Sequence, residues 1–363
     1  MGSSGKGLNT AGGQGKPKLR LQNLTKRFGQ EIAVENLSLT IQEGELLALV
    51  GHSGCGKTTL LRLISGLTPP DAGSIWLDGQ DVTALPAGQR DIVMVFQENL
   101  LFPHLTVGEN IAFGLKMTGC PQKVRIQKTR QLLELIQLPG IENKYPSQLS
   151  GGQKQRVSLA RALALEPKTV LLDEPLSNLD PKLREELRDL ILRLHKELQM
   201  TTVLVTHDRD EAMLMADRIA VMSYGKLLQV DTPINIYNQP RTREVASLFG
   251  PCNFLPGYLL DGEFWTENFR FTVPALKKGG RMVACIRSEH IKVTRPSQDK
   301  PTGVITEKKF LAGQSIFKVA FGNFTLLANG QDYFAYAPGN EVGLEIDWSR
   351  VYFNPEQLES GRA

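Results

Sequence analysis

Hydrophobic residues in the first two thirds of the chain follow an alternating pattern. Short apolar runs bounded by turn residues, such as ELLALV at 45–50 and TVLL at 169–172, are typical of buried strands. Stretches of helical character lie between such runs, for example at 121–138 and 181–199. This alternation continues to about Phe249 and predicts a layered α/β domain with a substantially parallel sheet.

The pattern changes at about Tyr237 to Pro240. Residues 252–363 contain short β-like segments, including RMVACIRSE, SIFKVAF and EVGLEIDW, which Gly, Pro and Asn separate. They predict a small all-β domain of barrel type. We therefore expect three parts: a flexible leader over 1–18, an α/β domain over 19–249 and a β-rich domain over 250–363.

Composition limits the classes of protein that fit. The 363 residues are 41% hydrophobic and 22% charged, as in globular proteins of about two domains. The net charge is +4, but six Lys or Arg residues precede the first acidic residue, Glu31, and without them it is −2. The body of the chain is therefore not expected to bind nucleic acid. No run of 18 apolar residues is present, so we expect no membrane-spanning helix.

The four cysteines are far apart in the sequence and form no C-x-x-C pair, so they indicate neither a zinc site nor a disulfide framework. They are Cys55, Cys120, Cys252 and Cys285.

A glycine-rich loop follows the apolar run at 45–50. The segment GHSGCGKTT matches G-x-x-x-x-G-K-[ST], with a predicted strand before it and a predicted helix after it. Its glycines let backbone N–H groups turn toward phosphate, Lys57 can reach the β- and γ-phosphates, and Thr58 can bind Mg²⁺. The candidate nucleotide-binding residues here are Gly51, His52, Ser53, Gly54, Cys55, Gly56, Lys57, Thr58 and Thr59.

Two acidic residues end the apolar run at 169–172. Asp173 can hold Mg²⁺ through water, and Glu174 can orient and activate the attacking water. The ends of parallel strands are where ligands bind in such sheets.

The segment LSGGQ at 149–153 opens a predicted helix. Ser150, Gly151 and Gly152 form a second anion-binding helix N-terminus. One chain needs a single cradle for one γ-phosphate, so the second cradle predicts that two subunits face each other head to tail.

Together these motifs resemble those of ABC ATPases, over about residues 19–249. The resemblance implies that the chain hydrolyses ATP with Mg²⁺, that Phe28 stacks on adenine and that Gln97 senses Mg²⁺ and the permease. It also implies that Gln153 and Asp180 belong to the signature and D-loop segments of the nucleotide site, and that His207 contacts the γ-phosphate. The expected catalytic residues are thus Glu174, His207 and Gln97, and the expected metal-binding residues are Thr58, Gln97 and Asp173.

The C-terminal segment RMVACIRSEHIKV is similar to the "RPEH" segment of regulatory domains in importer ATPases. Arg287 and His290 match that pattern, and Ser288 replaces its proline. This resemblance implies an importer ATPase with an oligonucleotide-fold-like regulatory extension, so an exporter is disfavoured.

Other classes of ABC protein remain as alternatives. A soluble ABC ATPase acting on DNA would need a long coiled coil between the phosphate loop and the signature, and ribosomal types carry two cassettes. Neither feature is present in this sequence. A binding module with an inactive cassette conflicts with intact Lys57, Glu174 and His207.

The resemblance also implies partners and a location. We expect a homodimer that encloses ATP, a transmembrane permease, a separate solute-binding protein, no nucleic acid, and a peripheral position on the cytoplasmic face of the inner membrane. The segments QENLLFPHLTVGENIAFGL and HDRDEAMLMADRIAVM are most similar to those of ferric-iron importer ATPases. Sulfate, polyamine and sugar importers are the alternatives.

Overall fold

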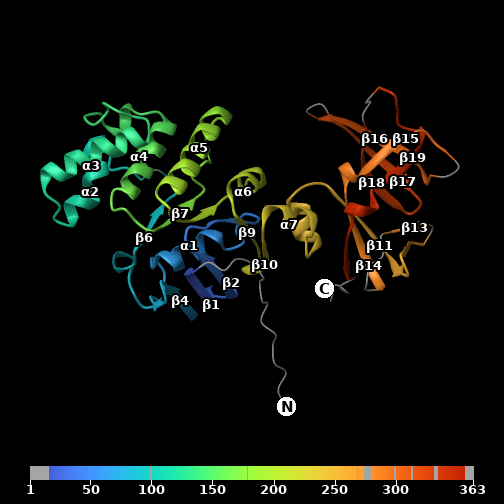
Figure 1. The fold of residues 1–363 in the computed structure, drawn as a ribbon, viewed down its shortest axis with the longest axis horizontal. Coiled ribbons are helices and arrows are strands. Elements are labelled where there is room, and N and C mark those ends of the chain that lie inside the picture. The colour runs from blue at the N-terminus through green and yellow to red at the C-terminus, as the bar shows by residue number, and fades with distance from the viewer. Residues whose placement is uncertain are drawn as a thin grey trace, which may run out of the picture. The chain divides into compact units, whose positions relative to one another are not determined.

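The computed structural model describes residues 16–98, 100–177, 179–267, 269–273, 279–297, 300–311, 314–330 and 334–355. The chain forms two compact units, which divide between Pro233 and Ile234 (Figure 1). No helix among the described residues has the length and apolar character needed to cross a membrane.

The first unit is built on a six-stranded sheet. Its strands, in spatial order, are β10 (Lys226–Asp231), β9 (Arg218–Ser223), β3 (Leu46–Val50), β8 (Thr201–Val205), β7 (Thr169–Asp173) and β6 (Ile92–Val95). All neighbouring pairs are parallel except β10 with β9. The predicted α/β layered domain with a substantially parallel sheet is confirmed.

Both faces of this sheet are buried, which explains the continuous apolar runs. Leu171 and Val203 belong to one hydrophobic core, whereas the next residues, Leu172 and Leu204, belong to another. Successive side chains on a strand point to opposite faces, so a strand between two cores must be apolar at every position.

A four-stranded antiparallel sheet and helix α1 (Lys57–Ser65) share the core on one face. The strands of this second sheet, in spatial order, are β2 (Glu31–Gln42), β1 (Pro17–Phe28), β4 (Ala72–Leu77) and β5 (Gln80–Asp81). Strand β1 begins within the predicted leader, which corrects that expectation for its last residues. Lys18 is only 2% exposed, and its Nζ lies 2.6 Å from Oδ2 of Asp78, so this ion pair anchors the strand. Residues 1–15 lie outside the described part.

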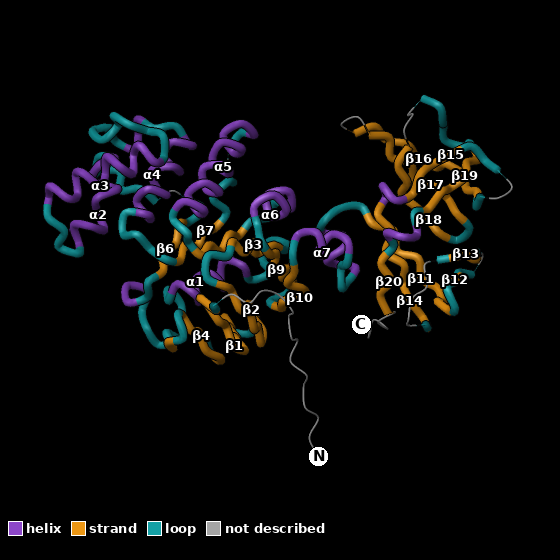
Figure 2. Tube along the Cα trace, viewed as in Figure 1, coloured by secondary structure: helices purple, strands orange, loops and turns teal. Residues whose placement is uncertain are grey.

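The other face of the six-stranded sheet packs against helices, which Figure 2 shows grouped away from β1, β2 and β4. They are α2 (Val107–Met117), α3 (Gln122–Leu135), α4 (Gly151–Leu163), α5 (Pro181–Glu197) and α6 (Arg209–Met215). The helices α2, α3 and α4 contact one another and form the helical subdomain. Short 3₁₀ turns occur at Ala87–Gln89 and Pro146–Gln148.

The described residues of the second unit form two short helices, a five-stranded sheet and a closed five-stranded barrel. The helices are α7 (Pro233–Asn238) and α8 (Arg243–Leu248). The sheet contains β13 (Arg270–Thr272), β12 (Glu263–Trp265), β11 (Cys252–Leu260), β14 (Gly280–Arg287) and β20 (Tyr352–Pro355). The barrel contains β15 (Ile291–Thr294), β18 (Phe324–Gly330), β17 (Gln314–Phe321), β16 (Thr302–Leu311) and β19 (Glu341–Ile346), with 3₁₀ turns at Ser288–His290 and Trp348–Arg350.

Sheet and barrel share one hydrophobic core, so they form a single unit. The predicted all-β barrel-like domain is confirmed, but the unit starts before the boundary that the sequence suggested. Its helices α7 and α8 are bonded to β14, because the guanidinium of Arg287 donates hydrogen bonds to the carbonyl oxygens of Tyr237, Ala246 and Gly250 at 2.9, 2.7 and 3.1 Å.

Candidate active site

The candidate catalytic residues follow four adjacent strands at one edge of the six-stranded sheet. The glycine-rich loop follows β3, His207 follows β8, Glu174 follows β7 and Gln97 follows β6. These strands are parallel and adjacent in the order β3, β8, β7, β6. Their carboxyl ends therefore meet at one edge, which is the position of ligand sites in open α/β sheets.

Two glycines of the glycine-rich loop, Gly51 and Gly56, lie so close to the neighbouring backbone that a side chain has no room there. A Cβ at Gly51 would lie 2.2 Å from the carbonyl oxygen of Met222, and one at Gly56 would lie 2.1 Å from that of Ala33. Gly54 and Gly56 also have positive φ angles of 79° and 104°, which side-chain-bearing residues rarely adopt. The backbone thus passes through a space that only glycine permits.

Helix α1 begins at the end of this loop and lacks the usual cap. Its N-cap residue is Gly56, and the helix, all of whose residues are described, has no side-chain cap hydrogen bond. Helices α2, α4, α5 and α6 are capped by Thr106, Ser150, Asp180 and Asp208. The N–H groups of the first turn of α1 are therefore suited to bind an anion such as phosphate.

Lys57 is folded back over the loop. Its side chain is buried, and its Nζ donates hydrogen bonds to the carbonyl oxygens of Gly51 at 2.8 Å and His52 at 3.0 Å. The thiol of Cys55 is also buried, and burial raises its pKa. His52, Ser53, Gly54 and Thr58 are exposed, whereas Thr59 is half-buried.

The loop and the end of β7 together provide oxygen atoms for a divalent cation. The hydroxyl of Thr58 donates a hydrogen bond to Oδ1 of Asp173 at 3.2 Å. Asp173 is 5% exposed, and burial raises its pKa, so an ionised carboxylate here would gain from a cation. A hydroxyl and a carboxylate are the hard oxygen ligands that Mg²⁺ prefers. Bound Mg²⁺ would neutralise charge on the phosphates.

Glu174 is the centre of the candidate catalytic cluster. Its Oε2 lies 3.0 Å from Nδ1 of His207 and accepts a hydrogen bond from Nε2 of Gln97 at 3.4 Å. The predicted catalytic residues therefore meet at one carboxylate oxygen. Gln97 contacts Glu174 in this structure, and its expected role in binding the metal stays a prediction.

The backbone of Glu174 is strained, a feature that the sequence did not indicate. Its φ is 46°, in the left-handed region, and its N–H donates to the carbonyl oxygen of Val205 on β8 at 3.0 Å. Its own carbonyl accepts from the hydroxyl of Ser177 at 2.8 Å. Such strain is common where a side chain must be aimed at a functional site.

Two further residues position the cluster, and sequence reasoning missed both. Thr206 accepts a hydrogen bond from the N–H of Asp208 at 3.0 Å and donates one to Glu211 at 2.6 Å, which fixes the turn that carries His207. Asn110 is fully buried and donates to the carbonyl oxygens of Phe102, Leu105 and Thr106, so it fixes the loop that follows Gln97. An asparagine on the same helical face as the apolar residues Val107 and Ile111 is the signal that could have revealed it.

Phe28 lies at the end of β1, beside the turn that leads into β2. Its ring is 53% exposed, and Nζ of Lys26 lies 5.5 Å from the ring centre. Ala33, farther along β2, is the residue whose carbonyl oxygen adjoins Gly56. Phe28 thus lies beside the start of β2, the strand whose residue Ala33 adjoins the phosphate loop.

The signature residues lie on a different element, the N-terminus of α4. The hydroxyl of Ser150 accepts from the N–H of Gln153 at 3.3 Å, and the side chain of Gln153 accepts from the N–H of Ser150 at 3.1 Å. Ser150 and Gly151 are exposed, while Gly152 is buried. Asp180 caps α5 by accepting from the N–H of Leu183 at 3.0 Å and is exposed.

This geometry has the parts of a phosphate-binding hydrolase. A sequence model described as ABC transporter matches residues 34–177, which include the glycine-rich loop, Gln97, the signature and Glu174. The Fe(3+) ions import ATP-binding protein FbpC of Photorhabdus laumondii is 42% identical over 311 residues, which cover 85% of this chain and 89% of that protein. The chain belongs to the ABC transporter family. It is an ATP-binding protein of that family and an ATPase.

Relatives with other names match this ABC transporter ATPase as well. The spermidine/putrescine import ATP-binding protein PotA of Nitrosospira multiformis is 43% identical over 347 residues, covering 91% of this chain and 94% of that protein. The sulfate/thiosulfate import ATP-binding protein CysA of Gloeobacter violaceus is 51% identical over 236 residues, covering 65% and 69%. These relatives belong to the same family, but each is named for a different solute.

A solved structure is similar to the first unit. It is a dimeric post-hydrolysis state of an ATP-binding cassette bound to ADP and Pi, with a TM-score of 0.54 and 34% identity. The matched region covers 59% of this chain and 98% of the chain in that structure. The predicted P-loop ABC-ATPase fold is thus confirmed.

Proposed function

We propose that this ABC importer ATPase works as a head-to-tail homodimer that energises a membrane permease for the uptake of ferric iron. The observation that carries the ATPase step is the meeting of His207 and Gln97 at Oε2 of Glu174, beside the pair formed by Thr58 and Asp173. Glu174 orients and activates the attacking water, and His207 and Gln97 hold its carboxylate in place.

The position of the signature supports the dimer. Ser150 and Gly151 are exposed at the N-terminus of α4, so the positive end of this helix faces outward, although the Ser150 hydroxyl caps it through the N–H of Gln153. In a head-to-tail pair, this end of one subunit covers the γ-phosphate that Lys57 of the other subunit holds. Each of the two sites then contains residues from both chains.

The region after Gln97 supports a permease partner. Leu100, Phe113 and Met117 are 51%, 36% and 69% exposed, so the loop and α2 present apolar side chains to the outside. Asn110 holds this loop against α2, so a force on one is transmitted to the other. We propose that the permease covers these side chains, that a separate protein captures the solute, and that the subunit is peripheral on the cytoplasmic face of the inner membrane.

Ferric iron is the proposed solute because the segments around Gln97 and after His207 are similar to those of ferric-iron importer ATPases, and FbpC relatives match most of the chain. Polyamine is the second candidate, since a relative named for spermidine and putrescine matches over 91% of the chain. Sulfate and sugar are further alternatives.

The test is uptake in a strain that lacks this subunit. We expect loss of labelled ferric iron uptake, while uptake of labelled sulfate, spermidine and sugar is unchanged. Complementation with the wild-type chain should restore iron uptake, and the Glu174→Gln variant should not. Unchanged iron uptake with loss of another solute would overturn ferric iron and leave the ATPase standing.

A further inference from the structure

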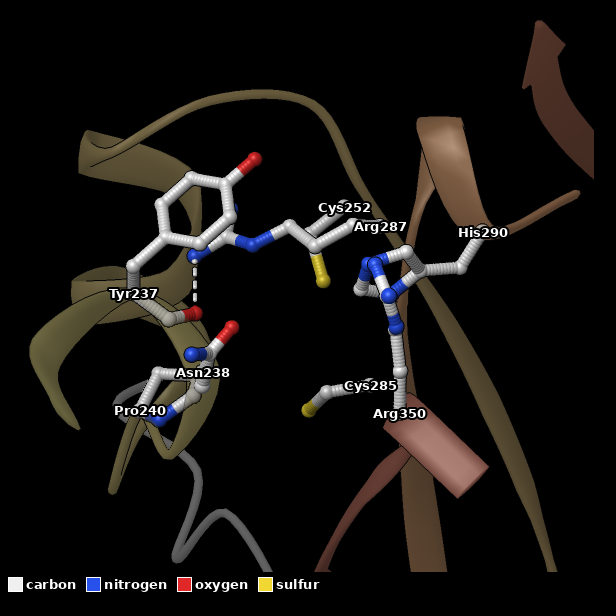
Figure 3. Close-up of a pocket in the computed structure, with 8 residues that line it drawn as sticks. All are labelled: Tyr237, Asn238, Pro240, Cys252, Cys285, Arg287, His290 and Arg350. Carbon is white, nitrogen blue, oxygen red and sulfur yellow. Dashed lines mark hydrogen bonds between the residues drawn. The ribbon is translucent and has the colours of Figure 1, made fainter. Parts of the chain in front are cut away.

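A pair of thiols lies beneath the helices that open the second unit. Cys252 is the first residue of β11, and Cys285 lies on the neighbouring strand β14. The register pairs Cys252 with Arg287 and Phe254 with Cys285, so the two cysteines are diagonal neighbours on one face of the sheet. Figure 3 shows both sulfur atoms directed into one small pocket.

The surroundings of Cys285 favour its thiolate. The Nδ2 atom of Asn354 lies 3.6 Å from its sulfur. The neighbouring Cys252 thiol lowers the pKa of Cys285, and Asn354, Arg287 and Arg243 act in the same direction against the effect of burial. The same thiol interaction raises the pKa of Cys252. The two shifts have opposite directions, so Cys285 is the better nucleophile of the pair. Cys285 is only 5% exposed, so a reactant can reach it only through the pocket.

The pocket is suited to a very small polar reactant. Its volume is about 10 Å³, the space of roughly one water molecule. His290 also lines it and is 8% exposed. The Nδ1 atom of His290 is buried and has no hydrogen-bond partner among the described residues.

We propose that Cys252 and Cys285 form an oxidative modification site that reacts with hydrogen peroxide to give a disulfide. The Cys285 thiolate attacks one peroxide oxygen, an S–O bond forms as the O–O bond breaks, and the released hydroxide takes up a proton to leave as water. The sulfur of Cys252 then attacks the sulfur of Cys285. The S–S bond forms as the S–O bond breaks, and the hydroxyl leaves with the Cys252 proton as a second water.

Disulfide formation would change the contact between β14 and the helices before β11. A disulfide usually has its Cα atoms about 4.4–6.8 Å apart, whereas diagonal neighbours on a sheet are about 7–8 Å apart, so Cys252 must move toward Cys285. Gly250 lies two residues before Cys252, and its carbonyl accepts a hydrogen bond from Arg287. Oxidation therefore weakens the hydrogen bonds from Arg287 to the carbonyl oxygens of Gly250 and of Ala246 in α8.

The experiment treats the full-length protein with hydrogen peroxide, blocks free thiols with iodoacetamide and identifies tryptic peptides by mass spectrometry. We expect a Cys252–Cys285 disulfide that forms faster than Cys120 is oxidised. Replacing Asn354 with Leu should slow the reaction, while the Cys120→Ser control should react at the wild-type rate. Absence of the Cys252–Cys285 peptide pair in wild-type protein, or equal rates at Cys285 and Cys120, would overturn the proposal.

Single substitutions separate the two roles. In Cys252→Ser, dimedone should trap a sulfenic acid on Cys285, whereas in Cys285→Ser the thiol at Cys252 should stay available to iodoacetamide. The opposite assignment would show that the order of attack is wrong. Hydrogen exchange of the oxidised wild-type protein, which needs no variant to fold, should increase at the amides of residues 246–252. Unchanged exchange there would contradict the loosening of α8.

Discussion

The Nδ1 atom of His207 lies 3.0 Å from Oε2 of Glu174, although the two residues follow different strands. The side chain of His207 is 60% exposed and that of Glu174 is 22% exposed, so the pair faces outward at the sheet edge. The hydrogen bonds of this carboxylate to described residues use Oε2, which leaves Oε1 for a water molecule. Because His207 and Gln97 both contact Glu174, replacing Glu174 is the most direct test of the proposed hydrolysis mechanism.

Replacing Glu174 with Gln should lower ATP hydrolysis by about 10²–10⁴, the range for loss of a positioned base. ATP binding should remain nearly intact, because the residues of the phosphate loop are untouched. ATP should then hold two subunits together, and gel filtration in Mg-ATP should show a dimer. Glu166→Gln is the control, since Glu166 is an exposed residue paired with Lys128. An undiminished rate, or a monomer only, would contradict this role.

The proposed shared site can be tested with mixed dimers. Lys57→Ala and Ser150→Arg should each nearly abolish activity as homodimers, since each removes one half of both sites. A mixed dimer places both changes in one site and leaves the other intact, so measurable hydrolysis should return. The measurement is ATPase activity of the purified mixed species, isolated by two affinity tags. If such dimers are isolated and remain inactive, either the head-to-tail arrangement is wrong or both sites must act together.

Gln97 should matter more for transport than for hydrolysis by the isolated subunit. Its hydrogen bond to Glu174 is long, at 3.4 Å, and its side chain is exposed, so Gln97→Ala should lower the basal ATPase activity of the isolated subunit only modestly. Solute uptake should fall much further, because the loop after Gln97 carries the apolar residues proposed to contact the permease. The exposed residue Gln127 on α3 provides the control, as Gln127→Ala. Equal losses of uptake and hydrolysis would make Gln97 a catalytic residue only.

The sequence was most informative where local chemistry dictates local structure. The apolar runs at 45–50 and 169–172 became β3 and β7, and the glycine-rich loop has the close approaches that demand glycine. The helix at 181–199 became α5, Pro181–Glu197, with proline in its first turn. Pattern and motif suffice for such features because they depend on neighbouring residues and on burial of both sheet faces.

Features that depend on distant partners were not predictable. The positive φ of Glu174 is maintained by a hydrogen bond to Val205, far away in the sequence. The second unit begins before residue 250 because Arg287 binds carbonyl oxygens of the preceding helices. The sequence pattern at residues 234–249 does not indicate these hydrogen bonds to Arg287. The reactive arrangement of Cys252 and Cys285 likewise arises from strand register, which spacing in the sequence does not reveal.

We expect the buried carboxylate of Asp173 to lower the stability of the folded chain at neutral pH, although its charge serves to bind Mg²⁺. Burial raises its pKa, so the folded state holds the carboxyl proton more tightly than the unfolded chain. Stability is then lost as pH rises from the unfolded pKa, about 3.9, through the raised folded pKa, and the full loss is present at neutral pH. Asp173→Asn removes the buried charge and keeps an oxygen that can accept the hydrogen bond from Thr58.

The Asp173→Asn protein without nucleotide should therefore melt at a higher temperature at pH 7, by about 2–4 °C for each 1 kcal/mol gained. At pH 4 the difference should shrink, because a larger fraction of the wild-type carboxyl is then protonated in the folded state. Its Mg²⁺-dependent ATPase activity should fall sharply, since a neutral amide is a poorer ligand for the ion. Scanning calorimetry at both pH values measures the first effect, with Asp189→Asn, a change at an exposed carboxylate, as the control. A lower melting temperature at pH 7 would mean that the carboxylate stabilises the folded chain even before Mg²⁺ binds.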